Sequence, residues 1–252
     1  MFITSTLTEL FRFSTPTKKH LSNSVTNVAA SLTPLASKFD HSKCVVRPLP
    51  EKITAGRDHF AIVIDNVLSE KECADWISTT EMAGYGHALV NIGGGRQEKM
   101  DDVRNSTRCI VDDADRAADI WSRVCGFIPE VRNPAKIPFS DIKPIEVNER
   151  LRFLKYDPGE FFAPHYDGAY TRRTGGSAGD TSMITLQVYL NEGFEGGSTR
   201  FFEDRSDYFY DVVPKTGSVL LFDHPMLHSG ESVIRGRKYA LRSDIMFTRI
   251  SR

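Results

Sequence analysis

The second half of the chain consists of short segments in which apolar and polar residues alternate, separated by Gly, Asn, Asp and Pro residues that favour turns. Alternation places one set of side chains on each face of an extended strand. The pattern predicts strands over residues 152–156, 182–190, 198–202, 218–222 and 238–248. Many short strands with no helix between them predict an antiparallel barrel or jelly roll.

The first half begins with a predicted strand and a predicted helix. Residues 59–64 form a mostly apolar run of strand length. Ser69 is predicted to begin a helix, because Glu72 three residues later completes a capping box with it. This helix is predicted to end near residue 80. Leu68 is placed to pack against Cys73 and to fix the entry of the chain into this helix.

A second helix is predicted over residues 113–124, with acids in its first turn and, on one face, Ala117, Ile120, Trp121 and Val124. Residues 84–99 between the helices predict a loop. Its three glycines, Gly93 to Gly95, neither follow a strand nor open a helix, which argues against a phosphate-binding loop. Both helices are expected to support the sheet as a packed layer, so the predicted fold is mainly β with supporting helices (α+β).

Composition and charge narrow the choice of partners. The chain has 252 residues, of which 40% are hydrophobic and 26% charged, as in a soluble globular protein. Lys and Arg number 32 against 33 Asp and Glu, so the net charge indicates neither nucleic acid nor a membrane as partner. No run approaches the about 20 apolar residues of a membrane helix. The oligomeric state stays open.

The four cysteines are spaced too widely for a zinc ribbon or a disulfide framework, and they are predicted to be reduced: Cys44, Cys73, Cys109 and Cys125. Residues 1–45 are rich in Ser, Thr, Lys and Leu, with Glu9 as the only acid before Asp40. This composition predicts a flexible or targeting extension, and a transit peptide would direct the chain to an organelle instead of the cytoplasm. A domain is expected over residues 46–252, with helical support over 46–145 and the β core over 146–252.

Three residues of the β-rich half suggest a metal centre. His165 and Asp167 lie two positions apart, so in an extended segment they point to the same side while Tyr166 faces away. A distant histidine, His228, can complete the set. Two imidazoles and one carboxylate occupy one face of an Fe(II) octahedron and leave positions open for a chelating cosubstrate and dioxygen.

Between Leu151 and Arg249 the chain resembles the prolyl 4-hydroxylase-like branch of the Fe(II)- and 2-oxoglutarate-dependent dioxygenases. The resemblance lies in four motifs in family order: YDPGEFFAPHYD (156–167), YLN (189–191) with GGSTRF (196–201), PKTGSVLLF (214–222), and His228 with Gly236 and KY (238–239). It implies a double-stranded β-helix, a cupin-like jelly roll, with His165, Asp167 and His228 as iron ligands. His224 lies in the same loop as His228, but only His228 has the family's ten-residue separation from Lys238.

The resemblance also implies sites for the cosubstrate. Lys238 stands where this branch places the cation for the far carboxylate of 2-oxoglutarate, and such a charge-assisted bond contributes about 1.5–3 kcal/mol. Arg242 lies four residues further along the same strand and faces the same side, so the sequence does not decide between the two cations. Tyr156, Tyr189 and Thr199 occupy positions where relatives place hydroxyl groups near the cosubstrate.

The implied reaction is hydroxylation of a C–H bond with O2 and 2-oxoglutarate as cosubstrates, succinate and CO2 as coproducts, and ascorbate as reductant. Relatives often act on peptidyl proline, and residues 103–106 resemble a stretch near their substrate groove. Tyr239 departs from the Trp that collagen-type relatives carry there. Three alternatives stay open: the same chemistry on a free small molecule, a catalytically silent barrel that acts as a binding module, and a zinc hydrolase.

Overall fold

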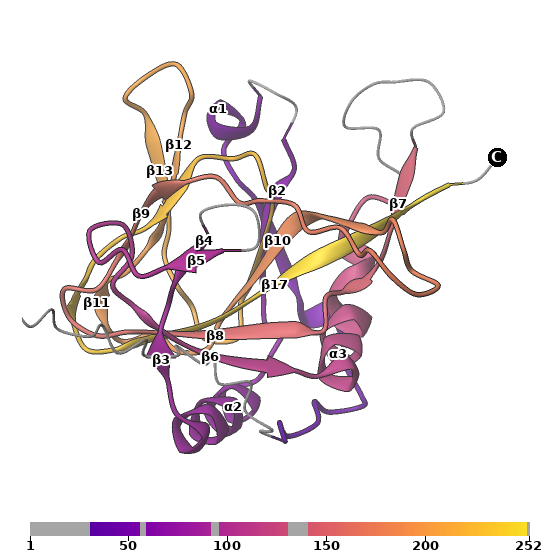
Figure 1. Cartoon of the computed structure of the whole chain (residues 1–252), viewed down its shortest axis with the longest axis horizontal. Coiled ribbons are helices and arrows are strands. Elements are labelled where there is room, and N and C mark those ends of the chain that lie inside the picture. The colour runs from indigo at the N-terminus through magenta and orange to yellow at the C-terminus, as the bar shows by residue number, and fades with distance from the viewer. Residues whose placement is uncertain (1–30, 56–58, 92–95, 131–140, 251–252) are drawn as a thin grey trace, which may run out of the picture.

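The fold is built around one large antiparallel sheet. The computed structural model describes residues 31–55, 59–91, 96–130 and 141–250. In this part of the chain the helices are α1 (Glu51–Thr54), α2 (Glu70–Ala83) and α3 (Ala114–Val124), with 3-10 turns at His41–Lys43 and Cys125–Phe127 (Figure 1). None of these helices is long and apolar enough to cross a bilayer.

The large sheet has the strand order β1-β2-β14-β10-β17-β8-β6-β3, and β7 pairs with β17 beside this path. Its strands are β1 (Val45–Pro48), β2 (Ala61–Asp65), β3 (Gly86–His87), β6 (Thr107–Asp112), β7 (Ile142–Val147), β8 (Arg150–Tyr156), β10 (Thr181–Tyr189), β14 (Val219–Asp223) and β17 (Lys238–Arg249).

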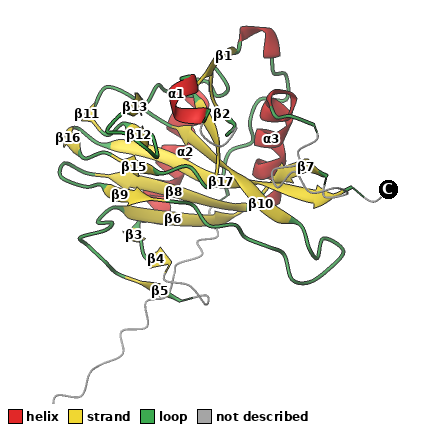
Figure 2. Cartoon of the chain, turned by 90° about the horizontal axis from the view of Figure 1, so that it is seen from above, coloured by secondary structure: helices red, strands yellow, loops and turns green. Residues whose placement is uncertain are grey.

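A smaller sheet faces it, in the order β13-β12-β15-β9. Its strands are β9 (Phe162–His165), β12 (Thr199–Phe202), β13 (Phe209–Val212) and β15 (His228–Gly230), and two-stranded pairs are formed by β4 (Val90–Asn91) with β5 (Gln97–Glu98) and by β11 (Glu195–Gly196) with β16 (Val233–Arg235). Figure 2 shows the smaller strands stacked beside the long ones. The prediction of a jelly roll with supporting helices is confirmed.

Burial on both faces explains the continuous apolar runs of the central strands. In β14, Val219 and Leu221 pack toward α2 and α3, whereas Leu220 and Phe222 pack toward the smaller sheet. Trp76 of α2 is fully buried and meets the ring of Phe153 edge to face at 6.0 Å. The central strands therefore lie between a helical layer and the smaller sheet, which is the supporting role predicted for the helices.

The predicted elements are largely present, with small corrections. The capping box of Ser69 and Glu72 is formed, and α2 continues to Ala83 because Gly84, at φ 91°, ends it. Residues 84–99 are not simply a loop, since they contain β3, β4 and β5; Gly93 to Gly95 lie outside the described residues. All four cysteines are free thiols.

The expected boundary at residue 46 is wrong. Leu32 and Leu35 are buried in the core, and Trp76 donates its indole N–H to the Thr33 carbonyl at 2.8 Å. The folded unit therefore includes residues from Leu32 onward, because these two leucines complete the apolar layer around the helices. Of the candidate targeting extension over residues 1–45, residues 1–30 lie outside the described residues.

Arg123 of α3 joins this segment to both helices. Its guanidinium, 3% exposed, donates to both carboxylate oxygens of Glu72 at 2.7 and 3.0 Å and to the carbonyls of Val67 and Ala36. Burial alone would raise the pKa of Glu72, but hydrogen bonds from Arg123 and from the Ala36 and Ser69 amides lower it to about 2.

We expect Glu72→Gln to lower the free energy of unfolding by about 2–4 kcal/mol at pH 7, because it leaves the buried Arg123 charge without its partner. The Glu72 carboxylate has a lower pKa in the folded state, so its contribution is present above about pH 4.5 and is lost as the pH falls toward 2. Urea unfolding at pH 7 and pH 3 should show a smaller difference at the lower pH. Exposed Glu70→Gln is the control, and a pH-independent difference would contradict the assignment.

A side chain at position 217 should strongly destabilise the fold. Gly217 has φ +74°, and a Cβ there would lie 1.9 Å from the Leu68 carbonyl oxygen. We expect Gly217→Ala to cost about 2–6 kcal/mol through backbone strain and overpacking. Gly193→Ala is the matched control, because Gly193 also has a positive φ (+83°) but has open space around it. Its cost should be about 1–2 kcal/mol; equal losses in denaturant unfolding would refute the close-approach argument.

Candidate active site

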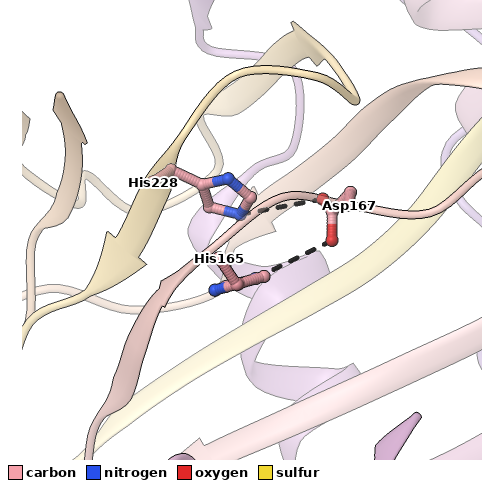
Figure 3. Close-up of side chains that lie close together, drawn as sticks. All are labelled: His165, Asp167 and His228. Carbon is pink, nitrogen blue, oxygen red and sulfur yellow. Dashed lines mark ion pairs between the residues drawn. The ribbon is translucent and has the colours of Figure 1, made fainter. Parts of the chain in front are cut away.

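Two histidines face each other across antiparallel strands of the smaller sheet. β15 pairs with β9 so that His228 lies opposite His165, and their ring centroids are 4.2 Å apart. Asp167 follows His165 by two residues, and both side chains point inward while Tyr166 is 53% exposed. Figure 3 shows the two imidazoles and the carboxylate converging on one point.

Backbone carbonyls hold both rings in orientation. Nδ1 of His165 lies 2.8 Å from the Ala163 carbonyl oxygen, and Nδ1 of His228 lies 3.0 Å from that of Met226. An Nδ1–H donated to a carbonyl leaves the Nε2 lone pair available to a metal ion. The Nε2 atoms of His165 and His228 lie 3.8 and 3.7 Å from the Asp167 carboxylate oxygens.

The Asp167 carboxylate is held on both sides. Thr185 donates its hydroxyl to Oδ2 at 2.5 Å, and a guanidinium nitrogen of Arg242 lies 2.9 Å from Oδ1. The Asp167 amide donates to the His224 carbonyl at 3.1 Å. Because each oxygen accepts from one protein group, each keeps a lone pair for a further partner.

Electrostatics keep these groups in the forms that bind metals. Burial, with the nearby His228, lowers the pKa of His165 to about 3, and burial also lowers the pKa of His228. Burial alone would raise the pKa of Asp167, but the Arg242 guanidinium and the Thr185 hydrogen bond hold it well below its usual range. Both imidazoles are therefore neutral and the carboxylate is ionised.

The donor set fits iron. The three ligand atoms lie within 4.8 Å of one another, and no other group of three His, Cys, Asp or Glu residues in the described part of the chain meets this criterion. Two imidazoles and one carboxylate on one side of a cavity correspond to the facial triad of non-haem Fe(II) oxygenases. The residues present can hold such an ion without rearrangement of the fold.

The triad opens into a cavity of about 50 Å³ between the two sheets. A buried water requires about 10–15 Å³, so the space admits several ligand atoms. Besides the triad and Thr185, the cavity wall includes Arg104, Tyr156, Phe162, Gln187, Thr199, Lys238 and Arg242. It therefore combines candidate metal ligands, cations and hydroxyl groups around one cavity.

Lys238 is a buried lysine on the wall of this cavity. It is 3% exposed, donates from Nζ to the Gly197 carbonyl at 2.6 Å, and lies over the rings of Tyr156 and Tyr189. No ion pair with an acid is recorded for it within the described residues. Burial lowers the pKa of Lys238 to about 7. A buried cation without a counter-ion is costly, which indicates a site prepared for an anion.

Thr199 lies next to this lysine as an oriented hydroxyl group. Gln187 donates to its Oγ1 at 2.9 Å and Tyr189 at 2.8 Å. A hydroxyl has two acceptor positions and one proton, so the Thr199 proton is left to donate to a ligand. Tyr189 is fully buried behind Thr199 and reaches the cavity through it.

Comparisons with known proteins agree with this geometry. Residues 151–243 match the model of the 2OG-Fe(II) oxygenase superfamily. Probable prolyl 4-hydroxylase 10 of Arabidopsis thaliana is 32% identical over 124 residues, covering 38% of this chain and 42% of the relative. Prolyl 4-hydroxylase 1 of the same plant is 25% identical over 200 residues, covering 71% of this chain and 66% of the relative. The chain thus spans less than two thirds of the length of these relatives.

Residues 151–243 are thus similar to the 2OG-Fe(II) oxygenase superfamily, and the curated relatives are named prolyl 4-hydroxylases. The fold agrees with that of a prolyl hydroxylase from Trichoplax adhaerens, solved in complex with a hypoxia inducible factor oxygen degradation domain peptide fragment. That structure has a TM-score of 0.54 and 14% identity, and the match covers 76% of this chain and 84% of the other. At this identity the likeness concerns the fold.

The structure brings most of the predicted site residues together. His165, Asp167 and His228 converge, and Tyr156, Thr199, Lys238 and Arg242 line the same cavity. The ring of His224 points instead toward Asp244, at 3.4 Å. The sequence analysis missed Thr185, which lines the cavity and contacts Asp167. Thr185 lies two positions before Gln187 on β10, so strand alternation could have placed both side chains on the same face.

Lys238 should make dicarboxylate binding depend on pH. With a pKa of about 7 in the empty cavity, the lysine loses its proton above neutrality, whereas a bound carboxylate stabilises the charged form. Binding of 2-oxoglutarate should therefore take up a proton and weaken about tenfold per unit between pH 7.5 and 9. Anaerobic calorimetry with Fe(II), in buffers of different ionisation enthalpy, measures both effects. Lys238→Arg, whose charge is permanent, should bind without proton uptake; uptake in this variant would assign the proton elsewhere.

Proposed function

We propose that this protein is an Fe(II)- and 2-oxoglutarate-dependent dioxygenase that hydroxylates a peptidyl residue, most simply proline. The observation that carries the proposal is the presence in one cavity of the His165, Asp167 and His228 triad and of a buried Lys238 that pairs with no acid among the described residues. A metal site alone would suit several reactions. A buried cation without such a partner favours an anionic cosubstrate.

Each group has a defined task in this reaction. When bound, Fe(II) and 2-oxoglutarate supply the oxidative decarboxylation that activates O2 for C–H hydroxylation, with succinate and CO2 as coproducts. His165, Asp167 and His228 would hold the metal ion through one nitrogen or oxygen each. Lys238 would neutralise the far carboxylate of the cosubstrate, and Thr199 and Tyr156 would donate hydrogen bonds to it.

A peptide substrate is supported by the surroundings of the cavity. Arg104 is 9% exposed, lies over the Phe162 ring at 4.6 Å, and lines the cavity beside the triad. Tyr166 and Tyr170, on the segment that follows β9, are about half exposed. Exposed aromatic side chains suit contact with proline-rich segments, which approach as preformed extended helices. The curated relatives are named prolyl 4-hydroxylases.

Ascorbate is proposed as the reductant that restores Fe(II) after turnover without substrate. This follows the behaviour expected of the branch, and it would act on the metal ion through the open side of the cavity. Zinc hydrolysis is disfavoured because Lys238 would then have no task at the site. A silent binding module is disfavoured because it would not require neutral histidines, an ionised carboxylate and a prepared anion site together.

The metal site and its anion anchor are tested by anaerobic titration with Fe(II) and then 2-oxoglutarate. We expect the weak visible charge-transfer band of a chelated 2-oxo acid in the wild type and none in His165→Ala. Lys238→Ala should need about 10–100 times more cosubstrate, because it loses a charge-assisted bond worth about 1.5–3 kcal/mol. Lys215→Ala, an exposed lysine, is the control. Iron binding without the band, or no iron binding, would overturn the oxygenase proposal.

The substrate class is tested by turnover. Proline-rich peptides should stimulate succinate formation in stoichiometric proportion to a mass gain of one oxygen atom on the peptide, and omission of ascorbate should shorten the period of activity. If free small molecules stimulate succinate formation and peptides do not, the same chemistry belongs to the small-molecule alternative. If His165→Ala retains the coupled turnover, the triad is not the reaction centre.

A further inference from the structure

A buried arginine touches the carboxylate of the metal triad. Nη2 of Arg242, on β17, lies 2.9 Å from Asp167 Oδ1 and 3.3 Å from Asp244 Oδ1. Arg242 and Lys238 line the same cavity from one strand, but their surroundings differ. Arg242 already pairs with two carboxylates, whereas no acid pairs with Lys238 among the described contacts. The two cations are therefore not equivalent.

A positive charge beside a metal ligand would normally repel a divalent cation. Here a second aspartate balances it. Asp244 is 3% exposed and lies 3.3 Å from both Arg242 and Arg152. The two arginines and the two aspartates, Asp167 and Asp244, therefore carry no net charge as a group. Arg242 can restrain Asp167 without adding net charge to this group, and the burial strengthens each contact.

The contacts leave the Asp167 side chain little freedom. Arg242 contacts Oδ1 and Thr185 donates to Oδ2, while the His224 carbonyl accepts from the Asp167 amide. The arginine is itself restrained, because Asp244 holds it from β17 and Gln187 lies opposite it on β10. Partners of this kind fix the orientation of metal ligands, and their loss typically costs 10–100-fold in metal affinity or activity.

We propose that Arg242, held by Asp244, is a positioning residue of the metal centre: it fixes the Asp167 carboxylate in the orientation that binds the metal, and the far carboxylate of the cosubstrate falls to Lys238 alone. This inference rests on the proposed function, because it assumes that the triad binds a metal ion. It separates the tasks of two cations that share one strand and one cavity.

The test compares two binding steps in Arg242→Gln and Lys238→Met. Anaerobic titration with Co(II), whose visible bands report the coordination geometry, should show about 10–100-fold weaker metal binding and shifted bands in Arg242→Gln. With metal saturating, this variant should bind 2-oxoglutarate within about threefold of the wild type. Lys238→Met should do the reverse, with wild-type Co(II) affinity and bands but at least tenfold weaker 2-oxoglutarate binding.

Arg242→Lys adds a conservative variant that keeps the charge. A lysine has a shorter reach and a single donor group, so it should restore the metal affinity and the Co(II) bands in part. It also carries the test if Arg242→Gln does not fold, as judged by thermal unfolding and near-UV circular dichroism. A merely structural role would lower the unfolding temperature and leave the bands of the folded fraction unchanged.

The outcomes separate this inference from the proposed function. If wild-type protein binds neither Co(II) nor Fe(II), the metal centre itself fails. If the wild type binds metal and both Arg242 variants keep its affinity and bands, the positioning role is overturned and the dioxygenase proposal stands. If the Arg242 variants bind metal normally but lose 2-oxoglutarate, Arg242 is a cosubstrate anchor and the division of tasks is wrong.

Discussion

The site depends on one strand pairing. β9 and β15 meet in the register that sets His165 opposite His228, and each ring is oriented by a carbonyl of its own strand or the turn before it. A shift of one residue would turn one imidazole to the outer face, because neighbouring side chains in a strand point to opposite sides. The smaller sheet therefore carries the two histidines of the triad, and the large sheet forms the wall behind them.

Burial has opposite effects on the two ends of the cavity. At the triad it favours neutral histidines, and the Asp167 charge survives there because Arg242 lies against it. At the other end Lys238 contacts the Gly197 carbonyl and two tyrosine rings but, among the described residues, pairs with no acid, so burial destabilises its charge. One end is thus charge-paired in the folded protein, whereas the other would be paired by an anionic ligand. Under the proposed function, this asymmetry would give a dicarboxylate a defined direction in the cavity.

The helical layer makes this wall rigid. α2 and α3 bury their apolar faces on the large sheet, and Arg123 with Glu72 joins them to the segment before β1. Local patterns predicted both helices because their caps and apolar faces lie within a few residues of one another. The segment from Leu32 was misjudged because its partners, Trp76 and Arg123, are distant in sequence. Composition alone reports nothing about such contacts.

The sequence by itself determined the class of fold, the triad and one cation, because strand alternation, the His-x-Asp spacing and the order of the motifs are local properties of the chain. Strand alternation placed Lys238 and Arg242 on one face of a strand, but it did not show which of the two binds the cosubstrate carboxylate. Only the tertiary structure decided between them, since it brings Asp167, which follows β9, to Arg242 of β17, whereas among the described residues no acid pairs with Lys238. Charge pairing depends on distances in space, and these are set by strand register between segments far apart in the chain.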